Sequence, residues 1–259
     1  MNIEFLTFLR REIYRFMVLY KQTIVPALLS SLLYILVFGE ALGSRIGPLE
    51  GQSYMSYIVP GLAMMSVITQ AYQNSASSIM QAKYLKFIED ILIAPLSGLQ
   101  VSLGYIIGGA MRGLICGLGI LIMCIILSEM PNAQDEFNIK NWPLTILYLL
   151  TVSWTFSAFG VIIGIYAKSW DEIGSFSNFI FMPMTFLGGV FYSVDMLSEP
   201  WRTISYFNPI YWMISGLRYS TLNIGEDLNL ISLFLCIGFS CLFTIIASYL
   251  FKTGYKIKS

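Results

Sequence analysis

LQVSLGYIIGGAMRGLICGLGILIMCIIL, residues 99–127, is an apolar run in which Arg112 is the only charged residue. About 20 consecutive apolar residues suffice to cross a bilayer as an α-helix. The run does not alternate apolar with polar residues, as the strands of a membrane β-barrel do. It therefore predicts a transmembrane helix, and its excess length predicts that the helix tilts or extends beyond the lipid.

The whole chain has the composition of such a protein. Of its 259 residues 56% are hydrophobic and 12% are charged, about half the charge of a soluble domain. Similar apolar runs recur along the chain. We expect a single all-α membrane domain with six transmembrane helices, at residues 23–42, 54–77, 99–127, 142–166, 175–194 and 228–251.

Several kinds of chemistry are disfavoured. The chain has no histidine, and its cysteines (Cys116, Cys124, Cys236 and Cys241) lie in apolar runs without CxxC spacing, which favours core packing over metal binding. Neither a GxxxxGK[ST] phosphate loop nor a GxSxG nucleophile motif is present. A net charge of zero disfavours nucleic acid. We expect no cofactor bound by this chain and no catalysis by it.

Residues 1–22 form an amphipathic pattern before the first apolar run. Its apolar positions recur at three- and four-residue steps: Ile3, Leu6, Leu9, Ile13, Phe16 and Tyr20. Charged residues lie between them: Arg10, Arg11, Glu12 and Arg15. This pattern predicts a helix in the membrane interface, with its basic side toward anionic lipid head groups.

Residues 78–97, SIMQAKYLKFIEDILIAPLS, form the inner segment, a charged stretch between two apolar runs. A helix from 83 to 92, ended by Pro95, would place Leu85, Ile88 and Leu92 on one face. Two interpretations remain open: a solvated loop with an amphipathic turn, or a helix that fits a groove on a cytoplasmic partner.

Residues 195–227 form the outer segment, which is too polar to span a membrane and too apolar for a free loop. Prolines and Gly216 interrupt an aromatic-rich stretch, which predicts two short helices that dip into the outer leaflet and return.

The distribution of lysine and arginine predicts the orientation, because these residues favour the cytoplasmic side. The side that holds the N-terminus carries the larger set: Arg10, Arg11, Arg15, Lys21, Lys83, Lys86, Lys168, Lys252, Lys256 and Lys258. The opposite side carries Arg45, Lys140, Arg202 and Arg218. Both termini and the inner segment are therefore expected in the cytoplasm.

Two charged residues lie within the predicted spans. Arg112 has either a functional role or only a structural one, in which neighbouring carbonyls or a water-filled cavity meet the hydrogen-bonding needs of its guanidinium. The sequence leaves both alternatives open. Glu40 is expected to extend to water near Arg45. The small residues around Arg112 recur four apart, which predicts close packing of a neighbouring helix: Gly104, Gly108, Gly109, Gly113 and Gly117.

Four stretches, in this order, resemble the ABC-2 family of ATP-binding-cassette permeases. They are SYMSYIVPGLAMMSVITQAY (53–72), KFIEDILIAPLSG (86–98), FLGGVFYSVDML (186–197) and FNPIYWMISGLRY (207–219). The resemblance runs essentially from end to end of the chain.

The resemblance implies a bacterial inner-membrane exporter subunit that pairs with a second permease, expected to be another copy, and with two separate ATPase subunits that use ATP and Mg. The inner segment would be the coupling helix that docks on the ATPase, through Lys83, Tyr84, Leu85, Lys86, Phe87, Ile88, Glu89, Asp90, Leu92 and Pro95. The basic helix, with Arg10, Arg11 and Arg15, would lie beside it. The outer segment would close the far side of the pathway, through Asn208, Pro209, Tyr211, Trp212 and Arg218. Family substrates include polysaccharides, lipid-linked sugars, drugs and other amphiphiles.

Two other classes compete with this interpretation. A self-contained secondary transporter or channel would need paired charges at mid-membrane and inverted repeats, and we find one midspan arginine, no buried acid and no repeat. An intramembrane enzyme without histidine would need a serine–lysine pair, and no lysine lies inside a predicted span.

Overall fold

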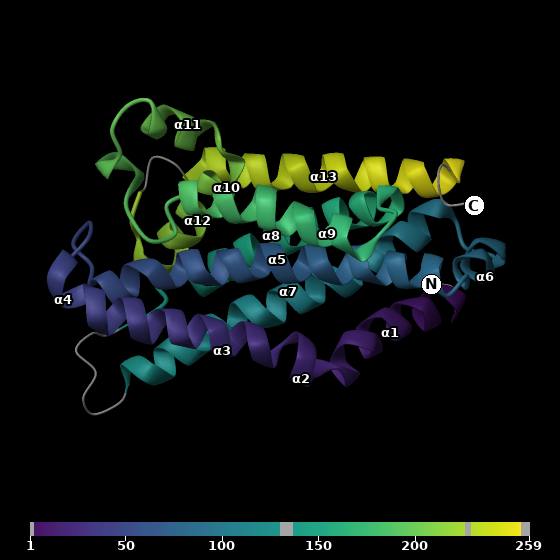
Figure 1. Ribbon diagram of the computed structural model, residues 1–259, viewed down its shortest axis with the longest axis horizontal. Helices are drawn as coiled ribbons and strands as arrows, with labels where there is room; N and C mark the ends of the chain where they lie inside the picture. The colour runs from purple at the N-terminus through teal and green to yellow at the C-terminus, as the bar shows by residue number, and fades with distance from the viewer. Residues whose placement is uncertain (1–2, 130–136, 226–228, 255–259) are drawn as a thin grey trace.

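The computed structural model describes residues 3–129, 137–225 and 229–254, and this part of the chain is helical throughout apart from its connections. Figure 1 shows an elongated bundle whose helices run mostly along one axis. The helices are α1 (Ile3–Val18), α2 (Tyr20–Thr23), α3 (Val25–Tyr34), the π-helix η1 (Ile35–Leu42), α4 (Gly43–Ile46), α5 (Tyr54–Tyr84), α6 (Ile88–Ile93), α7 (Gly98–Ser128), α8 (Trp142–Tyr166), α9 (Trp170–Phe176), the π-helix η2 (Ser177–Phe181), α10 (Met182–Leu187), the 3₁₀ turn η3 (Val194–Met196), α11 (Trp201–Phe207), α12 (Pro209–Leu222) and α13 (Asn229–Thr253).

The bundle has two distinct ends. The start of α1, the short helix α6 and the end of α13 gather at one of them, whereas α4 and α11 lie at the other (Figure 1). We call these the α6 end and the α11 end. The apolar core divides in the same way, with a smaller cluster beside α6 and a larger one along the rest of the bundle.

Helix α5 is the central element. It begins at Ser53, whose hydroxyl accepts a hydrogen bond from the Ser56 amide at 3.2 Å, and it continues through Pro60 without a break. Most of its side chains are buried, including the polar side chains of Asn74 and Ser75. Since α5 packs against α7, α8 and α12, its polar residues face protein rather than lipid.

Four described helices are long and apolar enough to cross a membrane: Tyr20–Gly39, Gly98–Ser128, Trp142–Tyr166 and Leu230–Thr253. The all-α membrane class is therefore confirmed, and six spans stay a prediction. Helix α5 reaches Tyr84, beyond the predicted end at residue 77, and it is not among the four because its buried polar residues lower its hydropathy.

Two predicted boundaries are wrong. The helix expected at 175–194 begins earlier, at Trp170, where the Ser169 hydroxyl caps α9. It also ends earlier, at Leu187. Residues 170–174, which lie between the predicted spans 142–166 and 175–194, are therefore helical. The first span is also irregular, because a break precedes Val25 and a π-helix occupies Ile35–Leu42.

The glycines of α7 permit the close packing that their spacing predicts. A Cβ at Gly108 would lie 2.9 Å from Cβ of Glu12 on α1. A Cβ at Gly113 would lie 2.9 Å from Cβ of Ala71 on α5 and 2.9 Å from Oγ of Ser153 on α8. Real Cβ atoms do not approach side chains this closely, so α7 needs glycine to pack against three neighbours. This prediction is confirmed.

Candidate functional site

The α6 end holds the inner segment, and its backbone differs from the predicted helix at 83–92. Helix α5 ends at Tyr84, residues 85–87 form a turn with Lys86 at φ 61°, and α6 starts at Ile88. Pro95 follows α6, as expected for a helix stop. The turn reorients α6 relative to α5, so the two parts of the segment do not share one helical face.

The predicted apolar face of Leu85, Ile88 and Leu92 is consequently wrong. Ile88 and Ile91 are 4% and 7% exposed and pack into the core cluster beside α6. Leu92 is partly buried against the same cluster, whereas Leu85 is exposed. The residue that the sequence interpretation missed is Ile93, which is 82% exposed.

The exposed surface of the inner segment therefore has a different membership. We call it the α6 surface, and it consists of Tyr84, Leu85, Lys86, Glu89, Asp90, Ile93 and Pro95. It combines large apolar side chains with charges of both signs, which is the mixed composition typical of a protein-binding patch.

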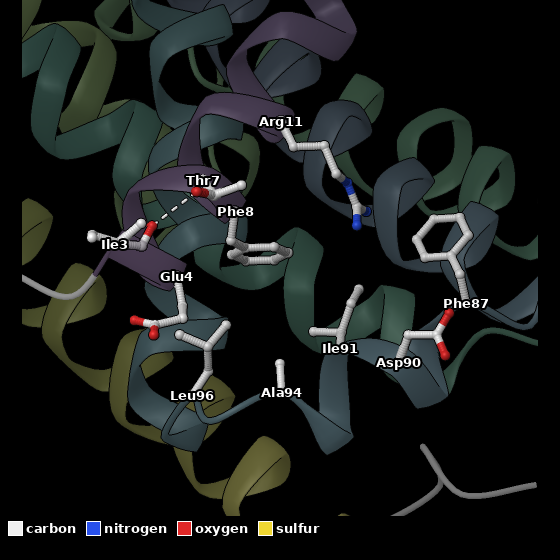
Figure 2. Close-up of a pocket in the computed structure, with 10 residues that line it drawn as sticks. All are labelled: Ile3, Glu4, Thr7, Phe8, Arg11, Phe87, Asp90, Ile91, Ala94 and Leu96. Carbon is white, nitrogen blue, oxygen red and sulfur yellow. Dashed lines mark hydrogen bonds between the residues drawn. The ribbon is translucent and has the colours of Figure 1, made fainter.

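A groove of about 650 Å³ separates α6 from α1 and adjoins the α6 surface. Figure 2 shows Phe8 and Arg11 of α1 facing Phe87, Asp90 and Ile91 across it. The guanidinium Cζ of Arg11 lies 4.6 Å from the centroid of the Phe87 ring, within cation–π range. The predicted proximity of the N-terminal helix to the inner segment is confirmed.

Helix α1 itself faces the bundle in an unexpected register. Phe8, Glu12 and Phe16 are buried, one helical turn apart, while Ile3 is 79% exposed. Phe8, Glu12 and Phe16 therefore form the face of α1 that packs on the bundle, and Glu12, which the sequence places among the charged residues, is not on the solvent side. Arg10 and Arg11 are exposed, and their contact with lipid head groups stays a prediction.

Glu12 is a buried acid, which corrects the expectation that the chain has none. Its Oε2 accepts a 2.5 Å hydrogen bond from the Ser78 hydroxyl of α5, and its Oε1 lies 3.2 Å from Nη2 of Arg11. Arg15 Nε lies 3.8 Å from Oε2, and Arg15 Nη2 donates to the backbone oxygen and Oδ1 of Asn74 at 2.8 and 3.0 Å. Burial lowers the pKa of Arg15, and the neighbouring carboxylate of Glu12 opposes that effect.

The charged groups of this Glu12–Arg15 cluster all belong to α1, and they join α1 to α5 through hydrogen bonds to the neutral Ser78 and Asn74. The sequence carried a signal for it: Phe8 and Glu12 are spaced four apart, and they meet Gly104 and Gly108, which are also four apart. The helix pattern of α1 and the glycine spacing of α7 are each predicted from the sequence, but their contact with each other is not.

Lys83 is also displaced from its predicted role on the docking surface. Its ammonium donates hydrogen bonds to the carbonyl oxygens of Gly164, Ile165 and Ala167 at 3.3, 2.9 and 2.7 Å. These are the last carbonyls of α8, which lack helical partners and carry the negative end of the helix dipole. Lys83 therefore caps α8 and fixes the end of α5 against it.

At the α11 end the outer segment forms two short helices, α11 and α12, as predicted. Asn208 caps α12 by accepting from the Ile210 amide at 3.0 Å, and its Nδ2 donates to the Met184 carbonyl at 2.5 Å. The Trp212 indole donates to the Tyr206 carbonyl at 2.8 Å. Tyr206 also stacks edge-on against Tyr211, and Pro209 starts α12.

Arg218 is buried, although the orientation argument treats it as a loop charge. Its Nη2 donates to the Gly189 carbonyl at 2.8 Å, and its Cζ lies 3.9 Å from the centroid of the Tyr57 ring on α5. Arg218 thereby joins α12, the turn after α10 and the part of α5 nearest the α11 end.

Arg112 projects from α7 toward α2 and α5. Its Nη2 donates to Oε1 of Gln70 and, at 3.3 Å, to the Thr23 carbonyl. Glu40 falls within η1, and its side chain lies outside the part that the structure describes.

These features define a helical membrane protein that carries, at its α6 end, an exposed surface of apolar and charged side chains beside a groove. The chain belongs to the ABC-2 type transporter family, whose model matches residues 3–222.

The chain is similar to two kinds of characterised relative. It is 42% identical to the inner membrane transport permease YadH of Escherichia coli (strain K12) over 250 residues, 96% of this chain and 94% of that protein. It is 24% identical to nodulation protein J of Rhizobium leguminosarum bv. viciae over 229 residues, 86% of this chain and 83% of that protein. Membership in a permease family makes the chain a non-catalytic transmembrane subunit of an ABC transporter.

Proposed function

We propose that this chain is the permease subunit of an ABC exporter in a bacterial inner membrane. Two copies of the chain pair with two copies of a separate ATPase that binds ATP and Mg. The α6 surface, together with the groove between α1 and α6, receives the ATPase. The observation that carries this assignment is the group of exposed apolar side chains on the α6 surface, Tyr84, Leu85 and Ile93, because apolar patches bordered by polar residues mark protein interaction sites.

In this proposal α5 and the helical stretch α9–η2–α10 complete six spans. Both termini and α6 lie in the cytoplasm, and α11 and α12 lie on the outer side. Helix α5 buries most of its surface against α7 and α8, so it needs less apolar character than a helix that faces lipid on all sides. The similarity to an inner membrane transport permease over 96% of this chain supports a multi-pass protein of the inner membrane.

The mechanism follows from how α6 is attached. ATP binding draws the ATPase subunits together and displaces α6, whose preceding residue Phe87 contacts Arg11 of α1 and whose buried isoleucines share a core cluster with Phe8. At 1.5 Å per residue, the 31 residues of α5 extend about 46 Å. Displacement at the α6 end therefore reaches Tyr57 and Arg218 at the α11 end. This coupling switches the pathway between inward- and outward-open states, and ATP hydrolysis resets it.

The test is co-purification of the permease with the ABC ATPase encoded beside it, followed by ATPase and transport assays in lipid. Ile93→Glu places a charge in the proposed interface and is expected to reduce ATPase capture at least tenfold, equivalent to about 1.4 kcal/mol. Phe207→Glu is the matched control, because Phe207 is 85% exposed at the opposite end of the bundle.

The docking assignment would be contradicted if both variants lost ATPase capture to the same extent. It would also be contradicted if neither variant lost it. Transport by the purified permease alone, driven by an ion gradient, would replace the proposal with a secondary transporter. Substrate identity is addressed separately, by stimulation of ATPase activity across a panel of amphiphiles, oligosaccharides and drugs.

A further inference from the structure

A groove of about 150 Å³ lies away from the α6 surface, where α8, η2, α10, α12 and α13 meet. Five phenylalanines form much of its wall: Phe156 and Phe159 of α8, Phe181 of η2, and Phe239 and Phe243 of α13. The surface that the lining residues expose to the groove is apolar. The groove therefore differs in chemistry from the mixed apolar and charged surface around α6.

The aromatic rings of this wall support one another across three helices. The ring centroids of Phe156 and Phe181 lie 5.3 Å apart, and those of Phe159 and Phe181 lie 5.8 Å apart. The centroids of Phe159 and Phe243 lie 5.2 Å apart. These are the separations of favourable aromatic pairs. Because each ring is held by a neighbour, the wall is formed in advance of any ligand.

The lining offers water no hydrogen-bonding side chain. Among the described residues that line the groove, Thr155 alone has a polar side chain. Its hydroxyl already lies within hydrogen-bond distance of the carbonyl oxygens of Thr151 and Cys236, at 2.8 and 3.3 Å. Apolar cavities of about this volume stay dry and take up small apolar molecules. The groove is therefore suited to a hydrocarbon and not to a polar or charged group.

The position of the groove along the helices identifies the hydrocarbon available to it. Helices α8 and α13 are both long and apolar enough to cross a membrane, and their lining phenylalanines lie near the middle of each helix. The middle of a crossing helix lies in the hydrocarbon core of the bilayer, where the ends of the acyl chains gather. Ile180, which is 39% exposed, lies at the mouth of the groove, whereas Ile210 and Met213 of α12, at 1% and 2%, form its floor. The groove thus opens toward lipid.

We propose that this groove binds the end of an acyl chain of a bilayer lipid. Its volume is below the about 300–1,000 Å³ that encloses a drug-sized ligand, so it takes the chain end while the rest of the lipid stays in the bilayer. The bound chain packs against Ile180 and Phe181 of the π-helix η2, and π-helical segments occur frequently at functional sites. The lipid thereby fills space beside η2 that the protein's own side chains leave open.

The test uses the purified full-length permease in nanodiscs of phosphatidylethanolamine and phosphatidylglycerol. The nanodiscs also contain a phosphatidylcholine with a photoactivatable diazirine at the end of one acyl chain, and mass spectrometry locates the labelled residues after irradiation. We expect label on Phe156 and Met213, which are 8% and 2% exposed, because a chain end inside the groove reaches both. Leu149, a buried residue of α8 that does not line the groove, should stay unlabelled.

A pair of neighbouring substitutions separates entry into the groove from contact with the surrounding lipid. Ile180→Trp enlarges a side chain at the mouth and is expected to reduce the label on Phe156 and Met213 about tenfold. Phe179→Trp is the matched control, because Phe179 is the adjacent residue of η2, is 80% exposed and does not line the groove. It should leave the label within about twofold of the unchanged chain. Phe234, 74% exposed on α13, should take the same label in all three proteins.

The proposal would be overturned if Phe156 and Met213 took no more label than Leu149, or if both tryptophan substitutions had the same effect on them. Labelling by a diazirine-tailed dodecyl phosphate without labelling by the phospholipid would also overturn it, because the occupant would then be a free amphiphile. If Ile180→Trp does not yield monodisperse protein, Met184→Trp, at another lining position, takes its place with the same thresholds. These measurements use the permease without an ATPase, so the acyl-chain site and the exporter function can fail separately.

Discussion

The buried pair of Glu12 and Arg15 allows a quantitative test of how α1 is fastened to the bundle. Glu12→Gln keeps the size of the side chain and still offers an acceptor to the Ser78 hydroxyl, but it removes the charge. We expect the free energy of unfolding to fall by about 2 kcal/mol. The measurement is unfolding of the purified protein in mixed micelles, followed by the loss of helical signal as denaturing detergent increases.

The magnitude follows from burial and distance. The Glu12 side chain is 1% exposed and that of Arg15 is 22% exposed, with 3.8 Å between Oε2 and Nε. At an effective dielectric constant of about 20, two charges at this distance attract by about 4 kcal/mol. Desolvation offsets part of this attraction. Arg15 also keeps its two hydrogen bonds to Asn74 in the variant, so the net loss is about half the Coulomb figure.

A double-mutant cycle with Arg15→Gln separates the pair from its surroundings. We expect a coupling energy of about 1–2 kcal/mol between the two substitutions. Glu4→Gln, at an exposed position on the same helix, should change stability by less than about 0.5 kcal/mol. Additivity of Glu12→Gln and Arg15→Gln to within about 0.3 kcal/mol would refute the reasoning, because the two charges would then act independently.

Two other predictions concern the packing of α8 and the α11 end. Gly160→Val should eliminate the monodisperse peak in size-exclusion chromatography, because a Cβ at this position would lie 2.5 Å from a backbone oxygen of α5. Gly238→Ala should be tolerated, because the space around Gly238 is open. Arg218→Gln should lower stability in the same detergent titration by about 2–3 kcal/mol through loss of its buried cation–π contact and hydrogen bond. Arg202→Gln, which breaks an exposed pair, should change stability far less than Arg218→Gln, because exposed ion pairs contribute little. An equal effect of the two arginine substitutions would contradict the prediction for Arg218.

What could be predicted from the sequence is what hydropathy and local spacing determine. Helix α8 runs over Trp142–Tyr166, the span expected from its apolar run. The glycines of α7 meet other helices because four-residue spacing places small residues on one side of a helix. Asn208 and Pro209 begin α12, since this pair combines a capping side chain with a residue suited to the first turn.

What could not be predicted depends on contacts between distant segments. Ile88 and Ile93 are equally apolar, and which is buried depends on the turn at 85–87, where Lys86 adopts a left-handed conformation that its residue type does not indicate. Glutamate is usually found at protein surfaces. The burial of Glu12 depends on how α1 packs against α7 and against Ser78 of α5. Lys83 belongs to a charged stretch in sequence, but three carbonyls at the end of α8 lie within its reach.

Two of the arginine contacts made by α5, one near each of its ends, are built in the same way. At the α6 end Arg15 comes from α1 and donates to Asn74; at the α11 end Arg218 comes from α12 and lies over Tyr57. In both cases α5 contributes a neutral group, so the central helix bears no buried charge of its own at either contact. Irregular π-helical backbone lies instead in η1 and η2, outside α5. In the proposed exporter, α5 would therefore move as a rigid rod held at both ends by its neighbours, and changes of helix geometry during transport would be accommodated by the first span and by the α9–η2–α10 stretch.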